Sequence, residues 1–161
     1  MLIAITADTH LRDPSGLPER CAELAAAADL VVHAGDFTSL AALEAFDRLA
    51  KRLIAVHGNV DAPEVVAALP EETTVRVGGV ELGIVHDAGP RRGRLARLRR
   101  RFPTADAVVF GHSHLPLCER EEDFQIFNPG SPTQRRRAPA HAVGLADAAS
   151  GSIRFEHVTI S

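Results

Sequence analysis

Five short apolar segments, each followed closely by Asp, Asn or His, narrow the fold of this chain more than any other pattern. The apolar segments are Leu2–Ala7, Leu30–Val32, Leu53–Val56, Val80–Val85 and Ala107–Phe110. The polar groups that follow them read Asp8-Thr9-His10, Gly35-Asp36, Gly58-Asn59-Val60-Asp61, His86 and Gly111-His112-Ser113-His114. Because the loops at the carboxyl ends of parallel strands meet at one edge of a sheet, we expect these side chains to converge.

The first 60 residues alternate between strand and helix patterns. The expected strands are Leu2–Thr6, Leu30–His33 and Leu53–Val56, and the expected helices are Leu17–Ala28 and Leu40–Lys51. Thr38 or Ser39 is placed to cap the second helix. Nearly continuous apolar strands joined by helices predict a parallel sheet. A short helix is expected over Ala62–Ala68, with Pro63 in its first turn.

The second half of the chain has a hairpin pattern instead. Glu72–Val77 and Val80–Val85 flank Gly78-Gly79, which favours a tight turn. A helix is expected over Arg91–Arg101, and the later strands are Ala107–Phe110, Phe124–Phe127, His141–Ala146 and Ser152–Thr159, with a turn at Asp147–Gly151. These patterns predict an α/β fold, in which two packed mixed β-sheets are flanked by helices in a single domain over residues 1–161.

Composition excludes several classes of protein. A net charge of -3 argues against a globally basic nucleic-acid binder. No apolar stretch approaches the roughly 20 residues that span a bilayer, and the N-terminus lacks a signal-peptide pattern. Cys21 and Cys118 have no framework spacing, so we expect reduced, buried thiols in a cytoplasmic protein.

The residues at the expected strand ends, Asp, Asn and His, are of types that commonly bind metal ions. In an Asp-x-His or His-x-His pair that continues a strand, residues i and i+2 point to the same side and can reach one ion. Each group alone has a structural explanation, such as a turn or a helix cap. Their joint occurrence in a consistent order predicts one polynuclear metal site.

The ordered set DxH, GD, GNxD, His and GHxH resembles the calcineurin-like metallophosphoesterases, specifically their small single-domain bacterial and archaeal phosphodiesterase branch. The motifs cover positions 8 to 114, and Asn128-Pro129-Gly130-Ser131 extends the match. The resemblance implies a four-layer α/β/β/α sandwich. It also implies that one metal is bound by Asp8, His10, Asp36 and His114. A second metal is then bound by Asp36, Asn59, His86 and His112.

The resemblance further implies hydrolysis of a small phosphodiester by in-line attack of a hydroxide that bridges the two metals. The residues expected to take part in catalysis are Asp36, Asn59, His10 and Asp61. We expect Asp61 either to accept a hydrogen bond from a metal-binding histidine such as His10 or merely to close its loop. Two divalent transition-metal ions suit this ligand set, with manganese as the first expectation and nickel, iron or zinc as alternatives.

Two positions depart from the family pattern. Many larger members have His at the position of Val60, where it is a candidate general acid for the leaving alcohol. Valine cannot donate a proton, which predicts better turnover of activated aryl esters than of alkyl esters. Asp87 follows His86 where relatives commonly have Gly, and its charge either repels dianionic monoesters or faces solvent.

The roles of several other polar residues stay open. The arginines of Arg91–Arg101 form either a solvated helix face or an electrostatic guide for phosphate or RNA. One residue of Arg135–Arg137 is a candidate for contact with substrate phosphate. Asn128 and Ser131 either orient ligands or build a turn, and His33 and His57 are either supporting donors or ordinary packed histidines.

Two alternatives to the phosphodiesterase remain. One is a phosphomonoesterase or phosphoprotein phosphatase that uses the same site. The other is a non-catalytic scaffold, as in the retromer subunit with this fold, although a scaffold needs no complete set of seven ligands. The expected partner is a small phosphodiester substrate, with neither membrane nor nucleic acid, and a homo-oligomer is left open.

Overall fold

Ten strands form two sheets in the computed structural model, which describes residues 1–161. The strands are β1 (Leu2–Thr6), β2 (Leu30–His33), β3 (Leu53–Ala55), β4 (Glu72–Val77), β5 (Val80–Val85), β6 (Ala107–Val109), β7 (Leu117–Glu121), β8 (Phe124–Asn128), β9 (Ala142–Ala149) and β10 (Ser152–Thr159). The first sheet has the order β10-β9-β1-β2-β3, and the second has the order β4-β5-β6-β8-β7. Both sheets are mixed, as predicted.

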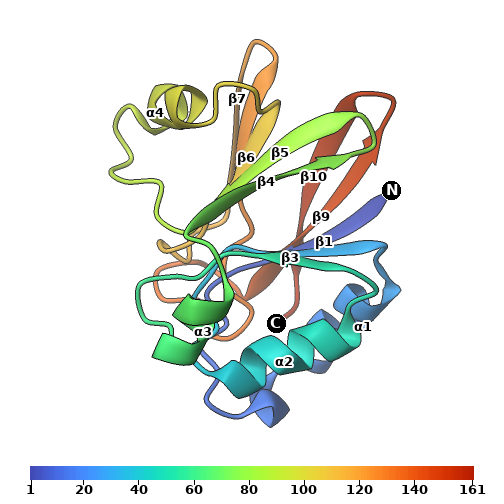
Figure 1. Ribbon diagram of the computed structural model, residues 1–161, viewed down its shortest axis with the longest axis vertical. Helices are drawn as coiled ribbons and strands as arrows, with labels where there is room; N and C mark the ends of the chain where they lie inside the picture. Colours follow the sequence, from blue (N-terminus) through green and yellow to red (C-terminus); the bar gives the residue numbers. More distant parts are fainter.

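Helices cover the outer faces of the two sheets (Figure 1). They are α1 (Glu19–Ala27), α2 (Leu40–Leu49), α3 (Pro63–Ala68) and α4 (Arg94–Arg101), with a 3₁₀ turn at Pro14–Gly16. Residues of α1 and α2 pack against Ala4 and Val31 of the first sheet. Leu98 of α4 packs against Val108 of the second sheet. The predicted four-layer α/β/β/α arrangement is therefore confirmed.

The largest apolar core lies between the sheets. Strand alternation sends Ile3 and Ile5 of β1 into this layer, where they join Leu82 and Ile84 of β5 in one cluster of 18 buried residues. The intervening Ala4 faces the helices. Both faces of β1 are thus buried, which explains why its sequence is continuously apolar.

The strands differ from the sequence prediction in three main details. The β9–β10 hairpin belongs to the first sheet, because β9 pairs antiparallel with β1. Strand β9 also extends to Ala149, since Asp147 points outward between the buried Ala146 and Ala148 and does not start a turn. Strand β7 was not predicted, because its charged segment forms a sheet edge with little burial.

Local sequence signals fix several element ends. Ser39 is the cap of α2, and its hydroxyl accepts a hydrogen bond from the backbone N–H of Ala42 at 3.1 Å. Helix α4 begins at Arg94 and not at the predicted Arg91, because Gly93 before it has a φ of 71°, outside the helical region. Both cysteines are free, but Cys118 is exposed, so its predicted burial is wrong. None of the helices combines the length and the apolarity that crossing a bilayer requires.

Candidate metal centre

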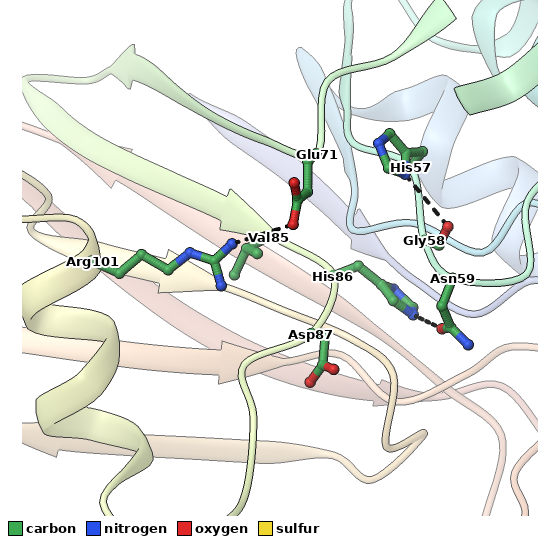
Figure 2. A pocket seen from close by; sticks show the side chains of 8 residues that line it. All are labelled: His57, Gly58, Asn59, Glu71, Val85, His86, Asp87 and Arg101. Atoms are coloured by element: carbon green, nitrogen blue, oxygen red, sulfur yellow. Dashed lines mark hydrogen bonds and ion pairs between the residues drawn. The ribbon is translucent and has the colours of Figure 1, made fainter. Parts of the chain in front are cut away.

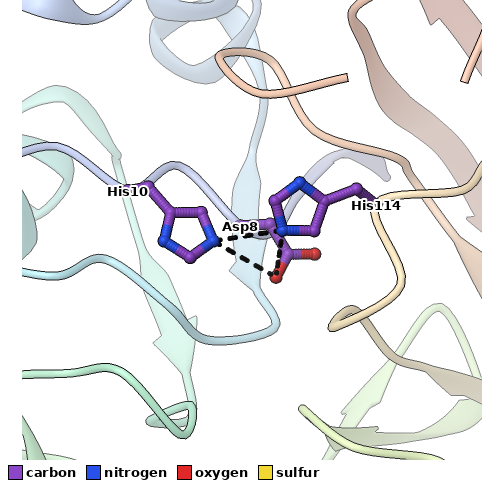
Figure 3. Close-up of side chains that lie close together, drawn as sticks. All are labelled: Asp8, His10 and His114. Carbon is purple, nitrogen blue, oxygen red and sulfur yellow. Dashed lines mark hydrogen bonds and ion pairs between the residues drawn. The ribbon is translucent and has the colours of Figure 1, made fainter. Parts of the chain in front are cut away.

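Strands β1, β2 and β3 run parallel to one another, and so do β5, β6 and β8. The polar residues that follow the strands of both sets meet at one place. Asp8 follows a strand of the first sheet, and His114 follows a strand of the second sheet more than 100 residues later in the chain. The Nε2 atom of His114 nevertheless lies 3.5 Å from Asp8 Oδ1. His10 Nε2 lies 3.1 Å from His114 Nε2 (Figure 3). Asp8, His10 and His114 therefore form one group that is able to hold a metal ion.

A second group adjoins the first. His86 Nε2 lies 3.1 Å from Asp36 Oδ2 and 3.9 Å from Asp8 Oδ1, so Asp8, Asp36 and His86 also form a group of potential ligands. The amide oxygen of Asn59 lies 3.0 Å from His86 Nε2 and 3.1 Å from His112 Nδ1. The structure thus brings all seven predicted ligands together.

Hydrogen bonds to backbone carbonyls fix the tautomers of two histidines. The Nδ1 atom of His86 donates to the carbonyl of Ala34 at 2.7 Å, and that of His114 donates to the carbonyl of Gln134 at 2.5 Å. In the neutral rings each Nε2 then carries a lone pair, directed at a carboxylate oxygen. Such hydrogen bonds orient the imidazole ligands of metal sites.

The backbone is strained at most of the ligand positions. The φ angles of Asp8, His10, Asp36, His112 and His114 lie between 43° and 67°. This left-handed region is uncommon for residues other than glycine and costs of the order of 1 kcal/mol or more at each position. The turns aim the side chains inward directly after each strand, and such strain persists where a functional geometry requires it.

The glycines of the GD and GN motifs allow two loops to touch. A Cβ atom on Gly58 would lie 2.0 Å from Asp36 Oδ1. Gly35 has a φ of 92°, and a Cβ atom there would lie 2.8 Å from the Nδ1 atom of His86. The close approach of these backbones places Asp36 beside Asn59 and His86, so neither glycine is merely a turn residue.

The Asp61 carboxylate accepts no hydrogen bond from His10 or from another histidine, so the first of its two predicted roles is wrong. Its carboxylate accepts instead from three backbone N–H groups: Asp36 at 3.0 Å, Thr38 at 2.7 Å and Gly58 at 2.7 Å. The alternative, a loop-closing role, is confirmed. Asp61 links the two loops that carry Asp36 and Asn59, because a carboxylate can accept several hydrogen bonds at once.

Side chains outside the ligand set hold the remaining loops in place. Asn128 donates to the carbonyl of Gly111 at 2.9 Å, and the hydroxyl of Ser131 donates to the carbonyl of Asp8 at 2.7 Å. Thr133 donates to the carbonyl of Thr9 at 2.6 Å. Asn128 and Ser131 therefore orient ligand loops. They also build the turn, because Asn128 Oδ1 accepts from the N–H of Gly130 and the Ser131 hydroxyl accepts from the N–H of Gln134, both at 2.9 Å, so both predicted alternatives are present. The role of Thr133 was missed, because an isolated threonine carries no recognisable pattern.

His33 and His57 differ in their surroundings. His33 is fully buried and stacks on Phe37 with ring centroids 3.5 Å apart. Its Nδ1 atom accepts from the N–H of Gly35 at 3.1 Å, so Nε2 carries the proton and donates to Thr9 Oγ1 at 3.1 Å. His57 is partly exposed beside the ligand cluster.

The electrostatics of the cluster favour a bound cation. Burial raises the pKa of Asp8 to about 7 and lowers that of His114 to about 4. Burial also lowers the pKa of His10. The Oδ2 atom of Asp8 is buried without any hydrogen-bond partner. Oxygen and nitrogen lone pairs therefore face one another in a poorly solvated space, and divalent cations fit the residues present.

A cleft of about 240 Å³ opens beside Asn59 and His86. Figure 2 shows Arg101 and Glu71 on the side of the cleft away from Asn59, and Asp87 next to His86. Arg101 forms an ion pair with Glu71 at 3.8 Å and a short one with Glu72. The cleft gives small polar molecules access to the ligand cluster, because only one of the eight residues that line it is hydrophobic.

Two packed mixed sheets whose parallel strand ends jointly carry histidine, aspartate and asparagine define a metallophosphoesterase. Comparison with known proteins agrees with this class. The domain described as "Calcineurin-like phosphoesterase superfamily domain" matches residues 1–151. The chain belongs to this family of metal-binding hydrolases.

Archaeal relatives agree with this membership. "Probable metallophosphoesterase MJ0623" of Methanocaldococcus jannaschii is 34% identical over 140 residues, which are 84% of this chain and 70% of that protein. A protein named as a phosphodiesterase in the same organism is 27% identical over 63% of this chain and 66% of its own length.

Wild-type Vps29 of Entamoeba histolytica, complexed with zinc, has a TM-score of 0.77 at 21% identity and covers 100% of both chains. The solution structure of a Thermotoga maritima protein has a TM-score of 0.77 at 26% identity over 98% of both chains.

Proposed function

We propose that this protein is a phosphodiesterase that hydrolyses small phosphodiesters with two divalent transition-metal ions, manganese being the first expectation. The observation that carries the proposal is the pair of adjoining ligand groups at the shared edge of the two sheets. One ion would be held by Asp8, His10, Asp36 and His114. The other would be held by Asp36, Asn59, His86 and His112.

Asp36 is the shared ligand in this proposal. Its Oδ2 atom lies 3.1 Å from His86 Nε2 and 3.7 Å from His10 Nε2, so it faces both groups. Asp8 Oδ1 lies at 3.9 Å from each of these two histidines. Asp36 is also less enclosed than Asp8, because its side chain keeps 4% of its accessible surface whereas that of Asp8 keeps none.

Two bound ions would supply an activated water at neutral pH and neutralise the charge that develops on the phosphoryl oxygens. The chain's own residues provide the fixed frame for that chemistry. His86 and His114 hold their Nδ1 protons on backbone carbonyls and present Nε2 to the site. Asp61 keeps the loops of Asp36 and Asn59 at a constant separation through its three backbone hydrogen bonds.

A diester substrate is supported by the residues around the cleft. Asp87 and Glu71 both line it, and only Glu71 is paired with the guanidinium of Arg101. The carboxylate of Asp87 accepts from the N–H of Gly89 at 2.8 Å but forms no ion pair, and its uncompensated charge disfavours the second negative charge of a monoester. The similarity to the phosphodiesterase of Methanocaldococcus jannaschii points the same way.

Val60 limits the choice of leaving group. Its side chain is 48% exposed at the edge of the site and offers no proton donor, while its backbone N–H is occupied by Asp36 Oδ1 at 3.0 Å. Protonation of a poor leaving group must therefore come from water or from another residue. We expect hydrolysis rates to fall as the pKa of the leaving alcohol rises, with aryl diesters faster than alkyl diesters. Rates that are insensitive to leaving-group pKa would contradict this role of Val60.

The decisive experiment compares bis(p-nitrophenyl) phosphate with p-nitrophenyl phosphate, in the presence of manganese, nickel, magnesium or a chelator. We expect metal-dependent turnover that favours the diester and that Asp36→Ala or His112→Ala abolishes. Preference for the monoester would identify a phosphomonoesterase. Absence of hydrolysis with every metal would refute the enzymatic proposal and favour a protein-interaction scaffold.

A further inference from the structure

The loop after β5 connects the ligand His86 to helix α4, and side chains of that helix hold its backbone. Residues 87–90 belong to no helix or strand. The carbonyls of Ala88, Gly89 and Pro90 accept hydrogen bonds from arginine side chains of α4, and none of them bonds to a backbone N–H. A carbonyl in a buried residue such as Ala88 needs a partner, so the arginines of α4 determine the path of this loop.

Arg97 makes the most contacts with the loop. Its Nε and Nη2 atoms both donate to the carbonyl of Ala88, at 3.0 and 2.7 Å, and Nη2 also donates to the carbonyl of Pro90 at 2.5 Å. Arg94, three residues earlier on the same face of the helix, donates to the carbonyl of Gly89 at 3.1 Å. Hydrogen bonds from a charged donor are about twice as strong as those between neutral groups, so Arg97 is the main support of the loop.

The arginines of α4 thus have roles that the sequence did not suggest. Arg94 and Arg97 are half-buried against loop carbonyls, whereas Arg99 and Arg101 pair with acidic side chains. Neither predicted role of the helix, a solvated face or a guide for phosphate, describes these four residues fully.

Gly89 leaves the space that the guanidinium of Arg97 occupies. A Cβ atom on Gly89 would lie 2.9 Å from Arg97 Nε and 3.0 Å from Nη2. Gly89 also has a φ of 74°, which side chains other than glycine seldom adopt. The loop conformation and the position of the guanidinium therefore depend on each other.

The loop begins at a predicted metal ligand. Strand β5 fixes the chain before His86, and the bonds from Arg97 to Ala88 and Pro90 fix the chain after it. Between these two supports, the Nδ1 atom of His86 donates to the carbonyl of Ala34, and the carbonyl of His86 accepts from the N–H of Gly111 at 3.0 Å. Arg97 therefore limits the directions that the imidazole of His86 can take.

We infer that Arg97 is a positioning residue of the metal centre, which holds His86 in the orientation that binds one of the two ions. It acts through the loop carbonyls and touches neither ion nor substrate. The inference rests on the proposed function, since it takes His86 as a ligand of the ion shared with Asp36, Asn59 and His112. The other proposed ion has no ligand from this loop, so the two ions are expected to respond differently.

The first test is calorimetric titration with manganese. Arg97→Ala is expected to weaken one of the two binding steps by about 10-fold and to leave the other close to its wild-type affinity. Arg97→Lys offers a single ammonium in place of the planar guanidinium and should restore part of the loss. Gly89→Ala displaces the guanidinium while keeping Arg97, and it should weaken the same step. Arg99→Ala is the matched control, because Arg99 lies on the same helix but pairs with Asp123, and both steps should stay at the wild-type level.

Hydrogen exchange of the chelator-treated protein gives a second readout that needs no metal. The N–H of Gly111 bonds to the carbonyl of His86 at 3.0 Å, whereas the N–H of Asp8 bonds to the carbonyl of Gly35 at 2.9 Å, away from the loop. Arg97→Ala should speed the exchange of the Gly111 amide and leave that of Asp8 unchanged, because the opening is local. A general loss of stability would speed both.

Wild-type manganese affinities and wild-type exchange at Gly111 in Arg97→Ala would overturn the inference. Equal weakening of both binding steps would also overturn it, as would the same losses in Arg99→Ala, because α4 would then support the whole fold and not His86. If the wild-type protein binds two ions but hydrolyses no diester, the proposed function fails, and the titrations and the exchange rates still decide the role of Arg97.

Discussion

Replacement of Asp61 by alanine tests whether this carboxylate assembles the metal centre from outside the ligand set. Asp61 accepts three backbone hydrogen bonds of 2.7 to 3.0 Å from the loops after β2 and β3. Each hydrogen bond to a charged acceptor stabilises a fold by about 1.5–3 kcal/mol. Asp61 is only half-buried, so water replaces part of this loss. We therefore expect Asp61→Ala to lower the free energy of unfolding by about 2–4 kcal/mol.

The assay is urea unfolding of the chelator-treated protein, followed by circular dichroism. Asp106→Ala is the matched control, because Asp106 is exposed, directly precedes β6 of the second sheet, and its carboxylate accepts one backbone hydrogen bond, from Glu81 at 2.8 Å. The control is expected to lose about 0.5–1 kcal/mol. Asp61→Ala is also expected to bind manganese about 10-fold more weakly, since the loops that carry Asp36 and Asn59 separate. A loss of stability no larger than that of the control, together with wild-type manganese affinity, would refute this reasoning.

Three further predictions concern the metal centre and its surroundings. Gly58→Ala places a Cβ atom 2.0 Å from Asp36 Oδ1, and calorimetry should show manganese affinity reduced at least about 10-fold; unchanged affinity would contradict the close approach. Manganese at 100 times its dissociation constant should stabilise the wild-type protein by about 2.7 kcal/mol, and Asp36→Ala should show no comparable shift in Tm. Burial lowers the pKa of His33 well below its usual value, so the folded protein keeps this ring neutral while the unfolded chain protonates it below about pH 6.5. Stability should therefore fall as the pH drops from 6.5, by up to about 1.4 kcal/mol per pH unit, and an equal pH dependence in His33→Gln would count against this assignment.

Much of the fold was predictable because apolar patterning follows burial. The strands of the first sheet from β1 to β3 are continuously apolar since they are covered on both faces, and the Gly-Gly pair between β4 and β5 has positive φ angles of 55° and 80°. The charged edge strand β7 has no such pattern. The placement of the β9–β10 hairpin beside β1 was not predictable either, because pairing partners across 140 residues leave no local signal.

The ligand set was also legible from residue types at strand ends, since metal coordination allows few side chains. The supporting contacts were not. The position of Asp61 in its motif is compatible with a hydrogen bond from His10 and equally with hydrogen bonds from backbone N–H groups. Only the folded loops show that the backbone N–H groups are its partners.

By itself, the sequence determined the family, the two-sheet architecture and the seven candidate ligands, because strand periodicity and ligand chemistry are properties of single segments. The tertiary structure decided which carboxylate oxygen faces which imidazole and which backbone carbonyl fixes the tautomer of each histidine. Those contacts join residues from opposite sheets, such as Asp8 and His114. Their geometry exists only when the parallel strand ends of both sheets meet at one edge.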